Sequence, residues 1–450
     1  MSDCAPAPDL ESVSVCVPDH YGRLAGKRIA GRRLEAVLAG GLDMPDFHLV
    51  TGPDIRPADE VAATGAHTGF PDDVLWPDMT TFRRLPWRPD CGIVLADARR
   101  RDGSVVAQAP RAILRRQAER LAGRRLSAWV ATELEFYVYE DSYAQAFRKG
   151  YRDLGALYHR NGDNDVLVTE FLDQYLRPLR LALAGLGLHA EATQGEGGAG
   201  QAEMNFPACA PVAAADGHVL FKFAAKALAH QMSRSVTFMA KPGRLQPGSG
   251  CHLHLSLRDE DGSPCMADAG TAQAGAGLSE RARRFLAGVL EFSPELTLLH
   301  APLVNSYRRL QPGDWAPSAA GWGYDNRAAM VRVVGRGPSL RMEFRLPGAD
   351  ANPYLAIAAL LAAGIAGLED DGIEFPPPLP PGGRDDAGPG GAAVPMDLTE
   401  AIERFEESKL ASRAFGDAVR DHVSGMARHQ LRLARRAVTD WELGQGFETA

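Results

Sequence analysis

The sequence predicts an α+β protein with a small unit at 11–108 and a larger unit at 109–450. Two observations support this prediction. Short β-type runs separated by Gly, Pro and Asp fill the first unit, whereas strands alternate with long helical patterns in the second. The pattern changes near Pro110, where RAILRRQAERLAG has the periodicity of an amphipathic helix that ends at Gly123. The 450 residues are enough for a large core and for two or more domains.

The composition excludes several classes of protein. The chain has 49 Lys and Arg against 57 Asp and Glu, a net charge of −8, and no long basic run, so we expect no nucleic-acid partner. The start, MSDCAPAPDLES, lacks the features of a signal peptide, and the apolar run Pro353–Leu368 is better interpreted as a buried helix than as a membrane span. Six cysteines without a CxxC pair indicate reduced thiols and no thiolate zinc site. We therefore expect a cytoplasmic protein that does not bind membranes.

The individual elements follow in order along the chain. In the first unit, VSVCV, FHLVTG and CGIVLADA are expected to form the strands of a small mixed sheet. In the second, 172–186 and 219–232 have helical periodicity, and Asp216 is a candidate cap for the latter helix. The Pro- and Gly-rich stretch 374–395 is expected to be a loop. The segments 398–415 and 428–436 are expected to be helical, and the basic charge of 428–436 is interpreted as a solvated helix face.

Several strand patterns in the larger unit place polar residues on one face. Residues two apart on a strand share a face, so apolar side chains alternate here with possible ligands. These possible ligands are Glu133 and Glu135 in TELEFYV, His252, His254 and Ser256 in CHLHLSL, Arg341, Glu343 and Arg345 in RMEFRL, and Glu196 and Glu203 in GEGGAGQAEMNF.

Each such strand alone is also explained as a half-exposed antiparallel strand with its charges in water. However, the outward residues are of the types that bind metals and anions. If the five glutamates converge, two carboxylates 4 Å apart repel by roughly 4 kcal/mol at an effective dielectric constant near 20, and cations would relieve the repulsion. Carboxylates with one imidazole suit Mg²⁺ or Mn²⁺.

A segment rich in arginine follows these strands, with NSYRRL at 305–310, WGYDNR at 322–327, and Arg332. Guanidinium groups bind carboxylates and phosphates in two-pronged geometry. Together with nearby metals they suit phosphoryl transfer, which depends on positioning and charge neutralisation. The chain has no GxxxxGK[ST] loop and no GxGxxG in a βαβ context, so a P-loop or Rossmann nucleotide site is excluded.

These segments together resemble the glutamine synthetase family over roughly residues 110–370. The resemblance rests on TELEFYVY, GEGGAGQAEMNF, TFMAKP followed by GSGCHLHLSL, NSYRRLQPGDWAPSAAGWGYDNRAAMVRV, and RMEFRLPGADANPYLAIAALLAAG; the final VTDWELGQGF is similar to the branch that ligates amines. The resemblance implies a small N-terminal β-grasp domain, a catalytic domain with a curved antiparallel sheet and helices, and a homo-oligomer of two stacked hexameric rings with sites between subunits. The family uses ATP to phosphorylate the γ-carboxylate of glutamate, which an amine then attacks.

The resemblance also implies residue roles. For one divalent ion it implies the ligands Glu135, Glu196 and Glu203, and for a second ion Glu133, His252 and Glu343. For glutamate it implies Arg309, Arg345 and the backbone of Gly248. For the nucleotide it implies Glu191, His254, Ser256, Arg327, Arg332 and Arg341, with Arg327 also touching the transferred phosphate. His254 has an alternative interpretation as a structural, hydrogen-bonded histidine.

Several positions depart from the family pattern in ways that affect the prediction. Trp315 replaces the flap glutamate of ammonia-using members; it cannot accept a proton but offers an apolar or cation–π surface to a larger amine. Alternatively, Trp315 only packs against its neighbours, and Asp314 takes the role of the flap glutamate. Pro247 and Pro338 stand where the family often has Asn and Lys.

One regulatory element and one substrate-binding element of the family are missing as well. No tyrosine follows Tyr354, so a tyrosine in the 374–395 loop cannot be adenylylated. No DGSS-type loop occurs in the N-terminal unit, where Asp54 or Asp73 is near the corresponding place. The missing acidic elements indicate a nucleophile other than ammonia.

The sequence therefore predicts an ATP-dependent ligase that joins the γ-carboxylate of L-glutamate to an organic amine such as a polyamine, ethanolamine or a monoamine, with ATP and two or more Mg²⁺ or Mn²⁺ ions. Trp315 and Arg327 are the catalytic candidates. The alternatives are a glutamine synthetase that uses ammonia, a non-catalytic member of the family and, less well supported, a guanidine phosphotransferase.

Overall fold

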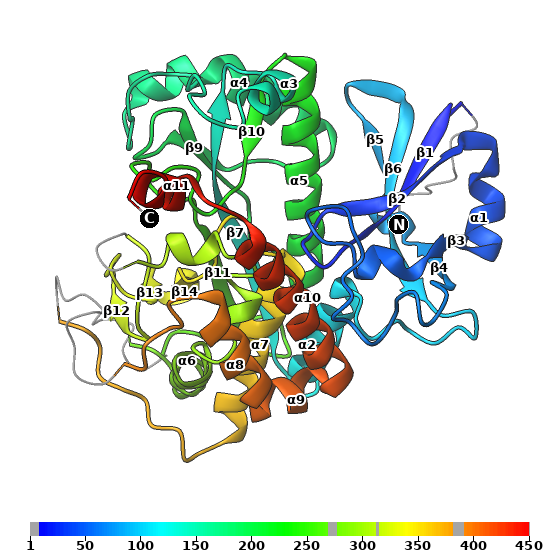
Figure 1. Ribbon diagram of the computed structural model, residues 1–450. Coiled ribbons are helices and arrows are strands. Elements are labelled where there is room, and N and C mark those ends of the chain that lie inside the picture. Colours follow the sequence, from blue (N-terminus) through cyan, green and yellow to red (C-terminus); the bar gives the residue numbers. More distant parts are fainter. Residues whose placement is uncertain (1–8, 269–276, 312–314, 381–390, 450) are drawn as a thin grey trace.

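The computed structural model describes residues 9–268, 277–311, 315–380 and 391–449. Two sheets organise the chain, one of six strands from the N-terminal part and one of eight strands from the rest. In Figure 1 the smaller sheet lies to the right of the long helix α5 (Pro211–Gln231) and the larger sheet lies to the left of it. The predicted α+β class is confirmed, because helices and antiparallel strands form separate layers and do not alternate in a parallel sheet.

The first sheet has the order β2-β1-β6-β4-β3, with β5 paired to β6. Its strands are β1 (Ser12–Pro18), β2 (Leu24–Ala30), β3 (Leu42–Pro45), β4 (Asp72–Pro77), β5 (Arg83–Leu85) and β6 (Arg88–Arg99). The central strands β1 and β6 run parallel and the other pairs antiparallel, so the sheet is mixed as expected. One predicted strand is wrong: FHLVTG begins inside a 3₁₀ helix, η2 (Asp46–Leu49), and its Thr51 forms only an isolated bridge with Pro57. Alternation cannot distinguish so short an apolar run from a helical turn.

The second sheet has the order β12-β13-β14-β11-β7-β9-β8, with β10 paired to β7. Its strands are β7 (Ser127–Tyr139), β8 (Ala192–Gly195), β9 (Gln201–Asn205), β10 (Ser235–Thr237), β11 (Cys251–Arg258), β12 (Trp322–Tyr324), β13 (Val331–Val334) and β14 (Arg341–Phe344). All its pairs are antiparallel except β12 with β13. The predicted ligand-bearing segments are therefore neighbouring strands of one sheet.

Helices pack against the apolar face of this sheet. The helices other than α5 are α1 (Leu34–Gly40), α2 (Pro110–Ala122), α3 (Tyr143–Arg148), α4 (Val166–Gly185), α6 (Glu280–Phe292), α7 (Pro353–Glu369), α8 (Leu398–Glu407), α9 (Lys409–Phe415), α10 (Asp417–Arg436) and α11 (Asp440–Gly446). Phe136 of β7 meets Phe221 of α5 edge to face, with ring centroids 5.7 Å apart. Helices α2, α4 and α5 thus leave the opposite face of the sheet for polar residues.

The predicted helices are present, but several begin at other residues than predicted. Helix α2 ends before Gly123 as predicted, but α4 begins earlier than the periodicity indicated. Helix α5 begins at Pro211, so the prediction that Asp216 caps it is wrong. Asp216 lies inside the helix, where its carboxylate is held by partners outside the helix.

Those partners connect the two sheets. The buried guanidinium of Arg111 on α2 donates to Asp216 at 3.0 and 2.9 Å, to Asp97 at 2.7 Å and to Asp78 at 2.6 Å. Tyr354 at the start of α7 donates to Asp216 at 2.6 Å. A buried arginine requires such partners, because removing its charge from water is costly.

Helix α7 is the predicted buried apolar helix, and its residues from Pro353 to Gly367 are all buried. It crosses α6 closely, since a Cβ placed on Gly288 would lie 2.3 Å from the carbonyl oxygen of Ala363. No helix in the described parts of the chain is long and apolar enough to cross a membrane.

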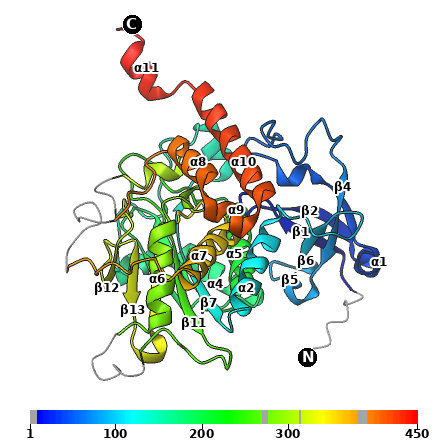
Figure 2. The same cartoon turned by 90° about the horizontal axis from the view of Figure 1, so that it is seen from below.

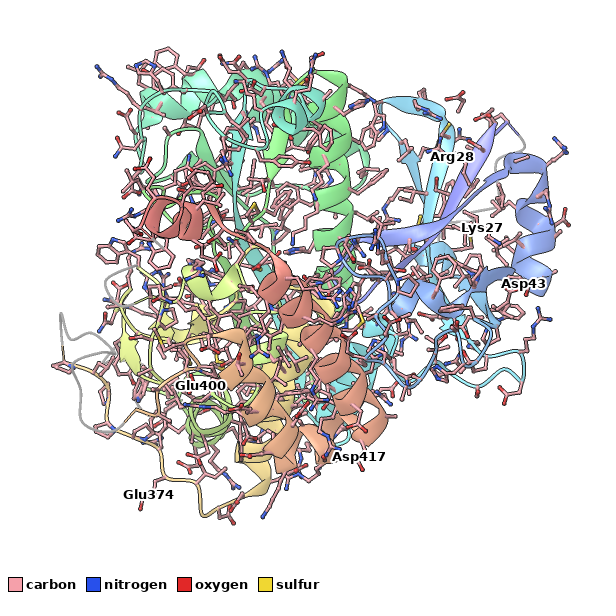
Figure 3. All side chains as sticks on the ribbon, viewed as in Figure 1. Lys27, Arg28, Asp43, Glu374, Glu400 and Asp417 are labelled. Atoms are coloured by element: carbon pink, nitrogen blue, oxygen red, sulfur yellow. The ribbon has the colours of Figure 1, made fainter. Side chains whose placement is uncertain are left out.

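The C-terminal helices lie at the edge of the molecule. The predicted helix 398–415 is divided at Ser408, whose side chain caps α9. Figure 2 shows α10 extending past the body of the protein, with α11 at its far end. The described ends of the 374–395 loop contain no helix, and its middle lies outside the described residues. In Figure 3 Lys27 and Asp43 are labelled on the first sheet, at the right of the view, and Glu374 and Asp417 are labelled at the lower edge of the molecule.

Candidate active site

The polar face of the second sheet begins on β7. Leu134, Phe136 and Val138 are fully buried in the core, whereas the side chains of Glu133 and Glu135 keep 16% and 13% exposure on the other face. The predicted alternation is therefore present. Because the strand spans thirteen residues, it supplies several positions of this face.

The register across the sheet pairs the predicted residues in rows. Glu133 of β7 lies opposite His252 of β11, and His254 of β11 lies opposite Glu343 of β14. Glu343 in turn pairs with Arg332 of β13. Directly opposed side chains on one face have Cβ atoms about 4.5–5.5 Å apart, so the register brings these residues into contact.

Glu133, His252 and Glu343 form the tightest group. His252 Nδ1 lies 2.7 Å from Glu133 Oε1 and 3.6 Å from Glu343 Oε1. One ligand atom from each of the three residues lies within 4.8 Å of the others. His254 Nε2 lies 3.1 Å from the second oxygen of Glu133. Burial would raise the pKa of Glu133, but the hydrogen bonds with the two histidines outweigh burial and lower it.

Glu135, Glu196 and Glu203 lie next to this group. Glu135 on β7 is directly opposite Glu203 on β9, and Glu196 follows β8. Burial, and then the charge of Glu196, raise the pKa of Glu135 to about 7. Burial and the charges of Glu133, Glu196 and Glu135 raise the pKa of Glu203 to about 10. Burial and repulsion between the charges of these three carboxylates thus favour their protonated forms.

The donors present fit divalent cations. The two groups offer five carboxylates and one imidazole, and all of these residues except Glu196, which follows β8, stand on strands of one sheet. Oxygen-rich sets of this kind suit Mg²⁺ or Mn²⁺. A cation between these carboxylates would replace the protons that burial and like charge now favour.

Glu343 is held by arginines as well. Its side chain is 1% exposed and accepts hydrogen bonds from Arg332 Nη1 at 2.8 Å and from Arg345. Burial would raise the pKa of Glu343, but His252 and Arg345 outweigh burial and lower it. The Nε of Arg345 is buried and has no partner among the described residues, which leaves a donor for a bound anion.

Arg309 lies near the acidic groups, because a Cβ on Gly250 would be 2.9 Å from Arg309 Nη2 and 3.1 Å from Glu135 Oε1. It is buried, and its two terminal nitrogens donate to the carbonyl oxygens of Leu346 at 2.9 Å and Arg345 at 3.0 Å. A Cβ on Gly248 would lie 2.8 Å from Cγ of Arg309, so a side chain there would collide with it. Gly248 presents its carbonyl oxygen to Gln201 Nε2 at 3.0 Å.

The remaining predicted residues are more exposed. Ser256 lies on the same face of β11, Arg341 Nε lies 3.3 Å from His254 Nδ1, and Glu191 is an exposed residue just before β8. Arg327 is exposed and makes no hydrogen bond or ion pair with any described residue. Trp315 is 75% exposed, and Asp314 lies outside the described residues.

Three residues near the site were not predicted. Gln201 Nε2 donates to Glu135 at 3.1 Å as well as to Gly248. Asp325 accepts from Arg332 Nε at 3.0 Å, and the hydroxyl of Tyr137 donates to the carbonyl oxygen of Pro247 at 2.9 Å. All three occur inside the quoted motifs. The sequence alone does not mark an amide, a charged residue in a turn or a tyrosine in a strand as part of a site, because their contacts arise only when the strands pair.

Comparison with known proteins shows the family. The family described as glutamine synthetase, catalytic domain, matches residues 107–445. The chain belongs to the glutamine synthetase family. It is therefore a carbon–nitrogen ligase, and enzymes of this family use ATP and divalent metal ions. The resemblance read from the sequence motifs is thus confirmed.

Individual relatives cover almost the whole chain. Gamma-glutamylethanolamide synthetase GlnA4 of Streptomyces coelicolor is 45% identical over 98% of this chain and 94% of its own length. Glutamate–isopropylamine ligase of a Pseudomonas species is 32% identical over 90% of this chain and 86% of its own. A solved complex of GmaS with ADP is similar at a TM-score of 0.83 and 26% identity, covering 98% and 97% of the two chains.

Proposed function

We propose that this enzyme joins the γ-carboxylate of L-glutamate to an organic amine in an ATP-dependent reaction that passes through γ-glutamyl phosphate. The observation that supports the proposal most directly is the meeting of two acidic groups with buried arginines on one sheet face. Two similar proteins are described as a gamma-glutamylethanolamide synthetase and a glutamate–isopropylamine ligase. Ethanolamine and small monoamines are therefore the first amines to test.

The acidic groups are the proposed metal sites. Glu133, His252 and Glu343 would hold one divalent ion, and a second would be held by Glu135, Glu196 and Glu203. Such ions neutralise phosphate charge as it develops during transfer. Mg²⁺ or Mn²⁺ fits the oxygen-rich donors.

The arginines are the proposed substrate-binding residues. Arg309 and Arg345 would bind the carboxylates of glutamate, supported by their burial and by the unpartnered Nε of Arg345. The backbone of Gly248 would receive the glutamate amino group. Holding the γ-carboxylate in line with the triphosphate accounts for much of the catalysis in such a reaction.

The nucleotide would extend along the same face. The proposed contacts are Glu191, His254, Ser256, Arg332 and Arg341, and Arg327 would touch the transferred phosphate. Arg327 suits that role because its guanidinium has no partner among the described residues. An arginine without a partner can stabilise charge that appears only during transfer.

Trp315 is the proposed determinant of amine choice. Its indole is 75% exposed, so it is accessible to a substrate. An indole attracts a cation or an alkyl group but cannot accept the proton of ammonium. We therefore propose a larger amine as the nucleophile in preference to ammonia.

A steady-state assay of glutamate-dependent phosphate release tests the proposal. We expect kcat/KM to be higher for at least one of ethanolamine, isopropylamine and putrescine than for ammonium. We also expect Trp315→Glu to raise activity with ammonium, whereas Trp315→Phe should not. Higher efficiency with ammonium than with every amine would favour a glutamine synthetase, and no phosphate release with any amine would favour a non-catalytic protein.

We also propose a homo-oligomer, as two stacked hexameric rings, and a domain boundary between residues 108 and 109. Large apolar side chains are exposed on α11 and near α3 and α4, among them Trp441, Phe447, Phe147 and Val166. Apolar surface of this kind is typical of protein–protein interfaces. Light scattering of the purified protein measures the number of subunits. The free thiols are compatible with the cytoplasmic location proposed from the cysteine pattern.

A further inference from the structure

One segment of the proposed glutamate site has no regular secondary structure. Residues 241–249 lie between β10 and β11 and include Gly248, whose backbone is proposed to receive the amino group of glutamate. The tip of this loop reaches solvent, since Leu245 is 94% exposed. Glycine has more conformational freedom to lose on folding than any other residue, so the backbone at Gly248 needs fixed partners if it is to bind a substrate.

Two side chains of the large sheet bind the backbone on either side of Gly248. The hydroxyl of Tyr137 donates to the carbonyl oxygen of Pro247 at 2.9 Å. Gln201 Nε2 donates to the carbonyl oxygen of Gly248 at 3.0 Å. Tyr137 on β7 lies directly opposite Gln201 on β9, so both donors come from one row of the sheet.

These two bonds hold both peptide units that adjoin Gly248. A peptide unit is planar, so the carbonyl of Pro247 and the N–H of Gly248 turn together, and so do the carbonyl of Gly248 and the N–H of Ser249. Ser249 also donates this N–H to the carbonyl oxygen of Ala240 at 2.9 Å. The two soft backbone angles of Gly248 lie between these planes and are set once both planes are held.

Tyr137 is itself held in place. Its side chain is fully buried, and its ring stacks on that of Tyr139 with centroids 6.2 Å apart. A Cβ on Gly198 would lie 2.1 Å from the hydroxyl oxygen of Tyr137, so glycine at this position leaves the space that the hydroxyl occupies. Burial raises the pKa of Tyr137, so the hydroxyl keeps the proton that it donates. Tyr137 therefore presents one fixed donor to the loop.

We infer that Tyr137 is a positioning residue for glutamate, because its hydroxyl fixes the peptide unit between Pro247 and Gly248. This inference rests on the proposed function, since it concerns how the glutamate site of that reaction is held. Gly248 lies against Arg309, as a Cβ on Gly248 would be 2.8 Å from Arg309 Cγ. The proposed partners of the amino group and of a carboxylate of glutamate are thus adjacent. A shift of the loop would change their separation, so that glutamate could no longer match both.

The alternative is that the loop merely supplies a partner to a buried hydroxyl. Buried tyrosine hydroxyls usually find a hydrogen-bond partner, and loss of such a bond lowers stability wherever it lies. Tyr175 on α4 distinguishes the two interpretations. It is also fully buried, and its hydroxyl donates to the carbonyl oxygen of Ala225 on α5 at 2.7 Å. Loss of either hydroxyl removes one buried hydrogen bond, but only that of Tyr137 reaches the loop.

Steady-state kinetics of Tyr137→Phe and of the matched control Tyr175→Phe test the inference, with the most efficient amine as the nucleophile. We expect Tyr137→Phe to raise the KM for glutamate about tenfold, or about 1.4 kcal/mol, which is at the upper end of the range for one hydrogen bond. Its kcat and its KM for ATP should stay within about twofold, because the loss concerns glutamate binding. Tyr175→Phe should leave all three constants within about twofold, although both variants should melt at similarly lower temperatures.

Gly198→Ala perturbs the same bond from the other side. Its methyl group would displace the hydroxyl of Tyr137, so it should also raise the KM for glutamate. The neighbouring variant Gly197→Ala is the control, because its Cβ would make only an ordinary contact of 3.5 Å with Pro247.

Limited digestion with trypsin measures the loop directly and does not depend on catalysis. Arg244 is exposed in the loop, and exposed loops are preferred sites of proteolysis. Cleavage after Arg244, identified by mass spectrometry, should be several times faster in Tyr137→Phe than in wild type or Tyr175→Phe.

The outcomes separate this inference from the proposed function. An unchanged KM for glutamate in Tyr137→Phe, an equal rise in Tyr175→Phe, or unchanged cleavage after Arg244 would each overturn the inference and leave the proposed function intact. Absence of glutamate-dependent phosphate release by the wild-type protein with every amine would instead refute the proposed function, and the inference with it.

Discussion

Gly250 lies where three residues of the proposed site meet, and replacing it with alanine tests the geometry directly. A Cβ at this position would lie 2.9 Å from Arg309 Nη2, 2.9 Å from His252 Nε2 and 3.1 Å from Glu135 Oε1. The backbone of Gly250 does not have a positive φ, so alanine adds no conformational strain there. The only perturbation is one methyl group between a proposed glutamate-binding arginine and two proposed metal ligands.

The size of the effect follows from these contacts. Comfortable contacts between heavy atoms lie at about 3.5 Å or more, so the neighbours must move by roughly half an ångström. They cannot move freely, because Arg309 is buried and bonded to two carbonyl oxygens and His252 is bonded to Glu133. Overpacking of this kind costs about 1–3 kcal/mol of stability. Misplacement of positioning groups by up to 1 Å can lower a rate about 100-fold. We therefore expect a folded enzyme whose kcat/KM for glutamate is about 100-fold lower.

The assay is phosphate release with saturating ATP and ethanolamine at varied glutamate concentration, with a melting curve for each variant. Gly197→Ala is the matched control, because its Cβ would lie 3.5 Å from the nearest atom, an ordinary contact with Pro247. It should retain nearly full activity. If Gly250→Ala is folded and as active as Gly197→Ala, the proposed assembly of Arg309, His252 and Glu135 around the substrate is refuted.

Three further predictions concern the stability of the protein. Arg111→Met should lower the free energy of unfolding by about 3–5 kcal/mol, because it leaves the buried Asp216 without its cation. The control Arg115→Met, closer to the surface, should lower it by about 1 kcal/mol or less. Equal shifts in the urea midpoint of the two variants would contradict the role of Arg111. Burial lowers the pKa of Lys222 from 10.5 to about 8. The unfolded chain therefore binds more protons than the folded protein between pH 8 and 10.5, and the stability of wild type relative to Lys222→Met should rise with pH over this range. A difference in stability between the two proteins that does not change with pH would contradict the shift. Mg²⁺ at a hundred times its Kd should stabilise the protein by about 2.7 kcal/mol over EDTA, and Glu343→Gln should reduce this gain; an unchanged melting temperature with Mg²⁺ and Mn²⁺ would count against the metal sites.

Much of the site could be predicted from the sequence because its pattern is local. Alternation in TELEFYV and CHLHLSL assigns Glu133 and His252 to polar faces without knowledge of any other strand. The same holds for the buried helix Pro353–Glu369, whose residues are apolar on every side. The family resemblance rests on such motifs as well. By contrast, FHLVTG was too short for its pattern to decide between strand and 3₁₀ turn.

The chain by itself thus determined the fold class, the faces of the strands and the types of ligand. Only the tertiary structure decided which of these residues touch: that His252 lies between Glu133 and Glu343, that Glu343 takes Arg332 and Arg345 as partners, and that Asp216 binds Arg111 across the molecule. The physical reason is that the alternation of side chains is set within a strand. Pairing is set by the register between different segments, which here lie from 11 residues apart, for Arg332 and Glu343, to 119 residues apart, for Glu133 and His252. A one-residue slip in that register would turn the side chains of a strand to the opposite face.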